Sequence, residues 1–126
     1  MTGEQVLVVE DNEKNMKLFR DVLSATGYRT LEATTGSEAV EMAAEHAPDL
    51  VLMDIQMPDF DGVEALRRLR ADARTASLRV LAVTAQAMQG DREHFLAAGF
   101  DGYLSKPVNV QELLGTVRRY CDGRAG

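Results

Sequence analysis

Residues 50–58 read LVLMDIQMP, and the first four of them, Leu50–Met53, form an uninterrupted apolar run. Val6–Val9 has the same continuous character near the start of the chain. Strands that face solvent on one side alternate apolar and polar residues, whereas strands of a parallel sheet covered on both faces do not. These two runs therefore predict central strands of a parallel sheet with helices on both faces.

Three further apolar runs, at Tyr28–Ala33, Arg79–Val83 and Gly102–Leu104, are short enough to be strands. Five groups of apolar residues at helical spacing lie between or after the runs: Met16, Phe19, Val22 and Leu23; Ala39, Val40, Ala43 and Ala44; Val63, Leu66 and Leu69; Phe95, Leu96 and Ala98; and Val110, Leu113, Leu114 and Val117. Strands and helices that alternate through short connections predict an α/β fold with a doubly wound sheet.

Glycine, proline and capping residues mark the ends of these elements. Gly27 and Gly99 fit the ends of helices, and Pro48 closes the second helix before the third strand. Asn109 predicts a cap for the last helix, and Ser37 falls in the first turn of the second.

The composition limits the size and the class of the protein. Its 126 residues fit one domain, which we expect over residues 1–122, with a frayed tail over residues 123–126. The net charge of −6 argues against a nucleic-acid partner, because binding the phosphate backbone needs a basic stripe. The sequence shows neither a secretory signal nor an apolar run of membrane-spanning length. With Cys121 as the lone cysteine, we expect a cytoplasmic protein, and a monomer.

Polar residues follow four of the predicted strands. Glu10 and Asp11 end the first, Asp54 the third and Thr84 the fourth, and the fifth runs into Lys106. Because ligands of an open parallel sheet bind at the carboxyl ends of the strands, we expect these side chains to converge on one rim. The convergence is more specific than any one residue, each of which alone would be a turn, strand or surface residue.

This set of side chains favours one kind of chemistry. Carboxylates that share a site repel each other, so a cation has to neutralise them. Oxygen ligands suit Mg²⁺ better than zinc, and the only histidines, His46 and His94, are predicted on helices. A metal ion, an ammonium and a hydroxyl together suit a phosphoryl group, for which Asp54 is the natural nucleophile.

The chain resembles response-regulator receiver domains of the CheY-like superfamily along essentially its whole length. The segments that carry the resemblance are VVEDN at 8–12, LMDIQMP at 52–58, Thr84-Ala85 and Lys106-Pro107. Residues 12–16 and 84–92 are most similar to single-domain receivers of the DivK type and to receivers of hybrid kinases. The resemblance implies a flavodoxin-like, five-stranded parallel sheet in the order 2-1-3-4-5.

The resemblance also implies a role for each residue at the rim. Asp54 would accept a phosphoryl group from a phosphohistidine on a sensor histidine kinase or a histidine phosphotransfer protein. Asp11, Asp54 and the backbone carbonyl of Gln56 would bind Mg²⁺, with Glu10 acting largely through water. Thr84 would donate a hydrogen bond to the phosphoryl group and Lys106 would pair with it.

The same resemblance implies how the signal leaves the domain. Lys106-Pro107 would be a cis peptide bond, and Tyr103 would be the aromatic switch residue. A downstream protein target would dock on the face formed by the fourth helix, the fifth strand and the fifth helix, with Met88, Arg92, Tyr103, Arg118 and Arg119. Gln56 and Gln86 would tune the lifetime of the phosphoryl group. The protein would then be a signalling switch rather than an enzyme acting on a separate substrate.

Several alternatives stay open at this point. A haloacid-dehalogenase phosphatase needs a general acid two residues after the nucleophile, where this chain has Gln56. A flavodoxin-like cofactor binder needs a phosphate loop after the first strand, which the sequence lacks. A docking-only pseudo-receiver would not need the full acidic set. The start at Met1 and the short tail favour a free-standing protein, although a module cut from a hybrid histidine kinase would look the same.

Asp59, Asp61 and Gly62 are predicted as loop or turn residues without a chemical role.

Overall fold

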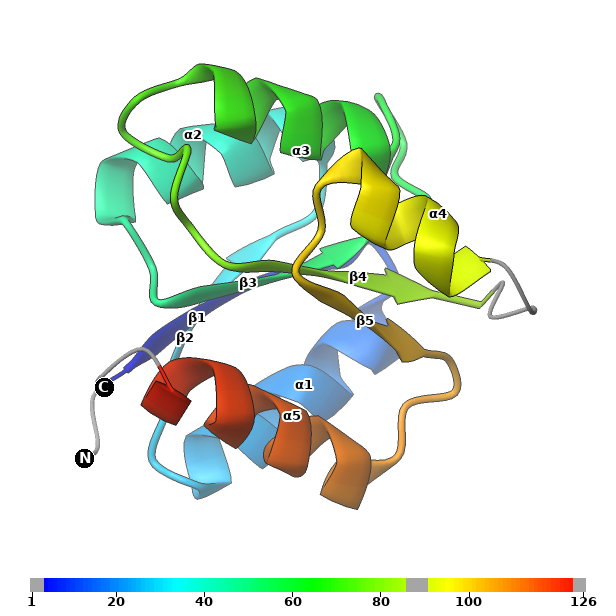
Figure 1. Cartoon of the computed structure of the whole chain (residues 1–126). Coiled ribbons are helices and arrows are strands. Elements are labelled where there is room, and N and C mark those ends of the chain that lie inside the picture. Colours follow the sequence, from blue (N-terminus) through cyan, green and yellow to red (C-terminus); the bar gives the residue numbers. More distant parts are fainter. Residues whose placement is uncertain (1–3, 86–90, 124–126) are drawn as a thin grey trace.

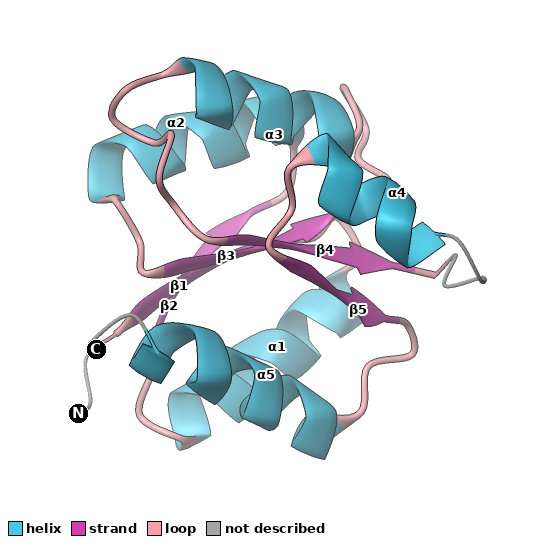
Figure 2. Cartoon of the chain, in the orientation of Figure 1, coloured by secondary structure: helices cyan, strands magenta, loops and turns pink. Residues whose placement is uncertain are grey.

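The computed structural model describes residues 4–85 and 91–123. For residues 91, 92, 122 and 123 it describes the backbone but not the side chain. Five parallel strands form one sheet in the order β2-β1-β3-β4-β5, and helices alternate with the strands along the chain (Figures 1 and 2). The elements are β1 (Gln5–Val9), α1 (Glu13–Ala25), β2 (Arg29–Ala33), α2 (Gly36–His46), β3 (Leu50–Asp54), α3 (Gly62–Ala71), β4 (Val80–Thr84), α4 (Asp91–Ala98), β5 (Gly102–Ser105) and α5 (Val110–Gly123). The predicted doubly wound α/β fold and its strand order are confirmed.

Helices cover both faces of the sheet, as the continuous apolar strands predict. In Figure 1, α2, α3 and α4 lie on one face, and α1 and α5 lie on the other. Val51 and Met53 of β3 join the core cluster on the first face, while Leu50 and Leu52 join the cluster on the second. Successive residues of a strand point to opposite faces, so every position of a strand that is buried on both faces favours an apolar residue.

Short polar side chains set where the helices begin. Asn12 and Thr35 accept hydrogen bonds from backbone N–H groups in the first turns of α1 and α2, and Asn109 accepts from Glu112 in α5. Asp61, predicted as a turn residue, does the same for α3. Gly62 is the first residue of α3 rather than part of a turn.

Other predicted boundaries are confirmed by the backbone. Gly27 and Gly99 have φ angles of 94° and 113°, in the left-handed region where a residue with a side chain is strained. The Lys106-Pro107 peptide bond is cis. Both histidines lie on helices, His46 at the end of α2 and His94 in α4.

The predicted core faces of the last two helices are partly wrong. Phe95 is buried in α4, but Leu96 is 40% exposed and Ala98 is exposed. Leu96 follows Phe95 by one step of about 100°, which turns its side chain away from the buried face. Val110 is 43% exposed because it begins α5 ahead of the turn that packs through Leu113.

Some predicted positions lie outside the described residues. They are Gln86 and Met88, and residues 124–126 of the predicted tail; the side chain of Arg92 is likewise not described. Within the described part of the chain, every helix is too short or too polar to cross a membrane.

Candidate phosphoacceptor and metal site

The parallel register brings the predicted site residues to one edge of the sheet. Val9 pairs with Met53, and Asp54 pairs with Val83, so the ends of β1, β3 and β4 lie side by side. Thr84 pairs with Ser105, which places the residue after β5 at the same edge. The convergence expected from the sequence is therefore present in the fold.

Asp54 is a buried carboxylate with hydrogen-bond donors on both oxygens. The residue is 4% exposed, and its Oδ2 lies 2.9 Å from Nζ of Lys106. Its Oδ1 accepts a hydrogen bond from the backbone N–H of Gln56 at 3.1 Å. These two donors hold both carboxylate oxygens of Asp54 in place at the end of β3.

Glu10 is more deeply buried than Asp54 and shares its lysine. It is 1% exposed, and its Oε1 lies 3.0 Å from Nζ of Lys106. Its Oε2 accepts from the backbone N–H of Asn12 at 3.2 Å and lies 3.5 Å from the amide nitrogen of Asn15. Desolvation raises the pKa of Glu10, and the charge of Asp54 adds to this, against the lowering effect of Lys106. Asn15 was not predicted as part of the site; the first turn of α1 brings it near Glu10.

Lys106 is the ammonium that two buried carboxylates share. Its side chain is 19% exposed, with Asp54 and Glu10 both within 3.0 Å of Nζ. Desolvation opposes the charged form, but the hydrogen bonds to the two carboxylates outweigh it and raise the pKa of Lys106. Lys106 therefore stays protonated at neutral pH, although it is largely removed from water.

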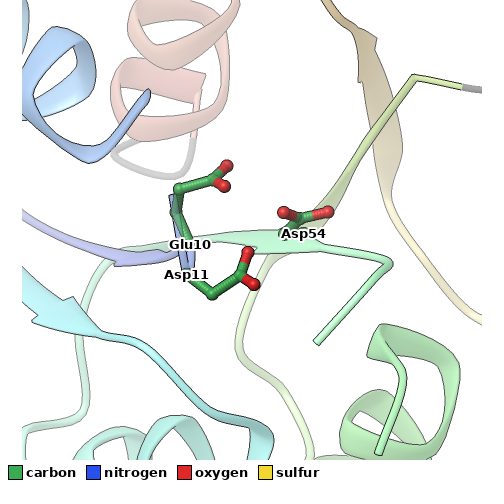
Figure 3. A group of neighbouring side chains, drawn as sticks. All are labelled: Glu10, Asp11 and Asp54. Carbon is green, nitrogen blue, oxygen red and sulfur yellow. The ribbon is translucent and has the colours of Figure 1, made fainter. Parts of the chain in front are cut away.

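The three carboxylates of the site could hold a metal ion. One oxygen each from Glu10, Asp11 and Asp54 lies within 4.8 Å of the others. Figure 3 shows the three side chains together beside the ends of β1 and β3. Asp11 is exposed, whereas the other two are buried, so the cluster opens to solvent on the Asp11 side. An all-oxygen cluster with one open side suits a hard divalent cation that keeps part of its water shell, so these residues fit Mg²⁺.

Thr84 ends β4, the strand beside β3, and Tyr103 lies on β5, the next strand along the sheet. Thr84 is 3% exposed, and its carbonyl oxygen accepts a hydrogen bond from the backbone N–H of Lys106 at 2.8 Å. Tyr103 is half-buried, and its ring centroid is 6.4 Å from that of Phe95 in α4. Tyr103 also lines a surface cavity of about 320 Å³. The other lining residues are Leu96, Asp101, Gly102, Thr116, Arg119 and Tyr120.

The loop after Asp54 is held at several points. The N–H of Gly62 donates to the carbonyl oxygen of Ile55 at 2.8 Å, which closes the loop on itself. A Cβ atom at Gly62 would lie 2.7 Å from the carbonyl oxygen of Asp54, so a larger residue would force the strand end to move. Asp59 accepts hydrogen bonds from the start of α2, a role that its sequence context did not reveal. Gln56 is exposed within this loop.

Comparison with known proteins shows the family of the chain. Residues 6–118 match the family described as response regulator receiver domain. The chain is 46% identical over 117 residues to the polar-differentiation response regulator DivK of Brucella ovis, covering 93% of this chain and 95% of that protein. The DivK protein of Brucella anthropi matches with the same identity and coverage.

Solved structures of similar chains have the same fold. The receiver domain of a sensor histidine kinase from Pseudomonas aeruginosa PAO1 superposes with a TM-score of 0.88 at 37% identity, covering 96% of this chain and 99% of that one. That structure holds a magnesium ion coordinated in its active site cleft. A response regulator described as putative from Chloroflexus aurantiacus gives a TM-score of 0.89 at 29% identity, with 96% and 99% coverage.

Proposed function

Because this chain belongs to the response regulator receiver family and thus to two-component signalling, we propose that it is a phosphorylation switch with Asp54 as the phosphoacceptor. The observation that carries the proposal is the environment of Asp54. Its carboxylate is buried, accepts hydrogen bonds from Lys106 and Gln56, and lies in one cluster with the carboxylates of Glu10 and Asp11.

The transfer step follows from the groups at this edge of the sheet. An oxygen of Asp54 attacks the phosphorus of a phosphohistidine, and the P–N bond breaks with its electron pair leaving on the imidazole nitrogen. The product is an acyl phosphate on Asp54, and the donor imidazole regains its neutral form by taking up a proton. The acyl phosphate carries roughly −1.5 to −2 charges where the free carboxylate carried −1, beside two further carboxylates. Lys106 is already charged and in place to pair with the new phosphoryl oxygens.

Mg²⁺ is the cation that we propose for the acidic cluster. Asp11, Asp54 and the backbone carbonyl of Gln56 would hold it, with Glu10 acting through water. When bound, Mg²⁺ neutralises the carboxylates and the phosphoryl oxygens that they would otherwise repel. Glu10 keeps Lys106 near Asp54 through their 3.0 Å contact, so this deep carboxylate also orients the ammonium.

The output of the switch would pass through Thr84, Tyr103 and the face formed by α4, β5 and α5. The Thr84 hydroxyl would donate to a phosphoryl oxygen, and the space beside Thr84 would then be open to the Tyr103 ring. That ring already borders the cavity next to α4 and α5, so a change in its position would reshape the surface offered to a partner. The partners would be a histidine kinase or a phosphotransfer protein upstream, and a protein target downstream.

Phosphorylation by a small-molecule donor tests the proposed acceptor directly. The protein is incubated with acetyl phosphate or phosphoramidate, with Mg²⁺ or with EDTA, and its intact mass is measured. We expect one phosphoryl adduct that requires Mg²⁺ and is absent from Asp54→Asn. Asp21→Asn, which removes an exposed aspartate of α1, is the matched control and should keep the adduct. An unmodified wild-type protein under every donor would contradict the proposal and favour a docking-only role.

A further inference from the structure

The loop that follows Asp54 is fastened to a turn that belongs to a different part of the sheet. Asp59 Oδ1 accepts hydrogen bonds from the backbone N–H of Gly36 at 2.8 Å and of Phe60 at 2.9 Å. Asp59 Oδ2 accepts from the backbone N–H of Ser37 at 2.9 Å and from its hydroxyl at 2.8 Å. One exposed carboxylate therefore receives four hydrogen bonds, three of them from the first two residues of α2.

This contact reaches across the strand that carries the other acidic residues. β1 lies between β2 and β3 in the sheet, so a loop after β3 that bonds the turn after β2 passes beside the end of β1. The end of β2 is itself bonded to the residue after β1, because the N–H of Glu10 donates to the carbonyl oxygen of Ala33 at 2.9 Å. The contacts of Asp59 thus tie the loop after β3 to the turn that leaves β2, the strand paired with β1.

Packing around Phe60 reinforces the contact. A Cβ atom at Gly36 would lie 2.4 Å from the Phe60 ring, so the ring rests directly on the backbone of α2. The Phe60 ring also contacts Arg68, whose guanidinium lies 4.1 Å from the ring centroid, within the range of a cation–π interaction. Asp59 and Phe60 together hold the loop against α2 through hydrogen bonds and packing.

The segment between the fixed points contains the proposed backbone ligand of the metal. The backbone N–H of Ile55 donates a hydrogen bond to the carbonyl oxygen of Val83 at 3.1 Å. Asp59 is held by its hydrogen bonds from the start of α2. Gln56, Met57 and Pro58 lie between these two anchors. If the second anchor were lost, the N–H bond of Gln56 to Asp54 would hold that residue from one side only. Its carbonyl could then sample orientations that do not face the proposed cation, and the loop would have to become ordered on binding.

We propose that Asp59 is a positioning residue for the metal, which sets the Mg²⁺ affinity of the site by fixing the Asp54 loop against the start of α2. The inference rests on the proposed Mg²⁺ site at Asp11, Asp54 and Gln56. Asp59 does not touch the ion; it acts by removing the freedom of the loop that supplies one ligand.

The test measures metal binding in the absence of any phosphoryl donor. MgCl₂ is titrated into ¹⁵N-labelled protein, and the affinity is read from the amide shifts of residues 10–12 and 54–58. We expect Asp59→Ala to bind Mg²⁺ about tenfold more weakly than wild type, the usual size of such an effect for residues that orient ligands. Ser37→Ala removes one of the four hydrogen bonds and should cause a smaller loss.

Asp61→Asn is the matched control for charge. It removes one negative charge from the same loop, while asparagine can still cap α3. A tenfold loss in Asp59→Ala with little change in Asp61→Asn supports positioning over simple electrostatic attraction. If Asp59→Ala does not fold, Asp59→Asn is read instead, since it retains one acceptor oxygen but cannot accept all four hydrogen bonds.

A second readout separates positioning from general destabilisation. The rate of modification by phosphoramidate is measured against Mg²⁺ concentration. We expect the half-saturating Mg²⁺ concentration of Asp59→Ala to rise by the same factor as its dissociation constant, and the rate at saturation to recover.

Two results would overturn the inference, and they have different meanings. Wild-type Mg²⁺ affinity in a folded Asp59→Ala would overturn the role of Asp59 and leave the proposed function intact. Absence of Mg²⁺ binding in the wild-type protein would overturn both.

Discussion

Lys106→Met should destabilise the metal-free protein by about 3 kcal/mol at neutral pH. The substitution keeps most of the apolar stem of the side chain and removes the ammonium. Lys106 Nζ lies 2.9 Å from Asp54 and 3.0 Å from Glu10, and both carboxylates are almost fully buried. At an effective dielectric constant of about 20, each contact corresponds to about 5 kcal/mol of attraction. The cost of desolvating the lysine offsets much of this, so the net loss is smaller than the sum.

Urea denaturation in EDTA is the assay for this prediction. With a denaturant slope of about 2 kcal/mol per molar, the loss lowers the midpoint by about 1.5 M. Lys17→Met is the matched control, because Lys17 also forms a close ion pair, at 2.6 Å to Asp21, but both side chains are more than half exposed. Its midpoint should stay close to that of wild type, since exposed ion pairs contribute little to stability.

The loss in Lys106→Met should also depend on pH in a defined direction. Burial already raises the pKa of Glu10, and removing Lys106 takes away the interaction that lowers it. A carboxyl group whose pKa is higher in the folded than in the unfolded state gains stability as pH falls through the folded value. The destabilisation should therefore shrink between pH 8 and pH 5. A wild-type midpoint at neutral pH, or a loss that stays constant with pH, would refute the charge balance that we assign to the site.

Three substitutions away from the charged groups test the packing that supports the site. Gly62→Ala should cost about 2 kcal/mol in urea denaturation, because the new Cβ meets the backbone at the end of β3 at 2.7 Å. Thr75→Val should cost about 2 kcal/mol, since the buried hydroxyl donates to the carbonyl oxygen of Leu69 at 2.6 Å and the carbonyl would lose this donor. Gly102→Ala should cost about 1 kcal/mol and change the near-ultraviolet circular dichroism of the tyrosines, because its Cβ would lie 2.5 Å from the Tyr120 hydroxyl. Wild-type midpoints in these variants would contradict the packing described.

The sequence predicted the strands and the edge at which the site lies because both depend on local patterns. A continuous apolar run such as Leu50–Met53 indicates a strand buried on both faces wherever it occurs. Once the strands are parallel, the residues that end them must meet at one edge, so Asp54 and Lys106 could be placed together although they are 52 positions apart.

The contacts of Asp59 and the face of α4 could not be predicted in the same way. Asp59 looks like a loop aspartate, and its partners in α2 lie 22 and 23 positions earlier in the chain. Only the tertiary path of the loop brings them together. In α4, four consecutive apolar residues at the end of an eight-residue helix cannot fix which side faces the sheet, and Phe95 is the one that is buried.

The contacts of Lys106 link the proposed acceptor to the proposed output face. Its side chain pairs with Asp54, while its backbone N–H is bonded to the carbonyl oxygen of Thr84. Tyr103, three positions earlier, borders the cavity beside α4 and α5. A phosphoryl group shifts the balance between two states only by interacting differently with them. New contacts of a phosphoryl group with Lys106 or Thr84 would act on two residues that are bonded to each other. Thr84 lies on β4, which pairs with the strand of Tyr103. Lys106, which pairs with the proposed acceptor, is therefore also bonded to the strand that lies beside Tyr103 and the proposed output face.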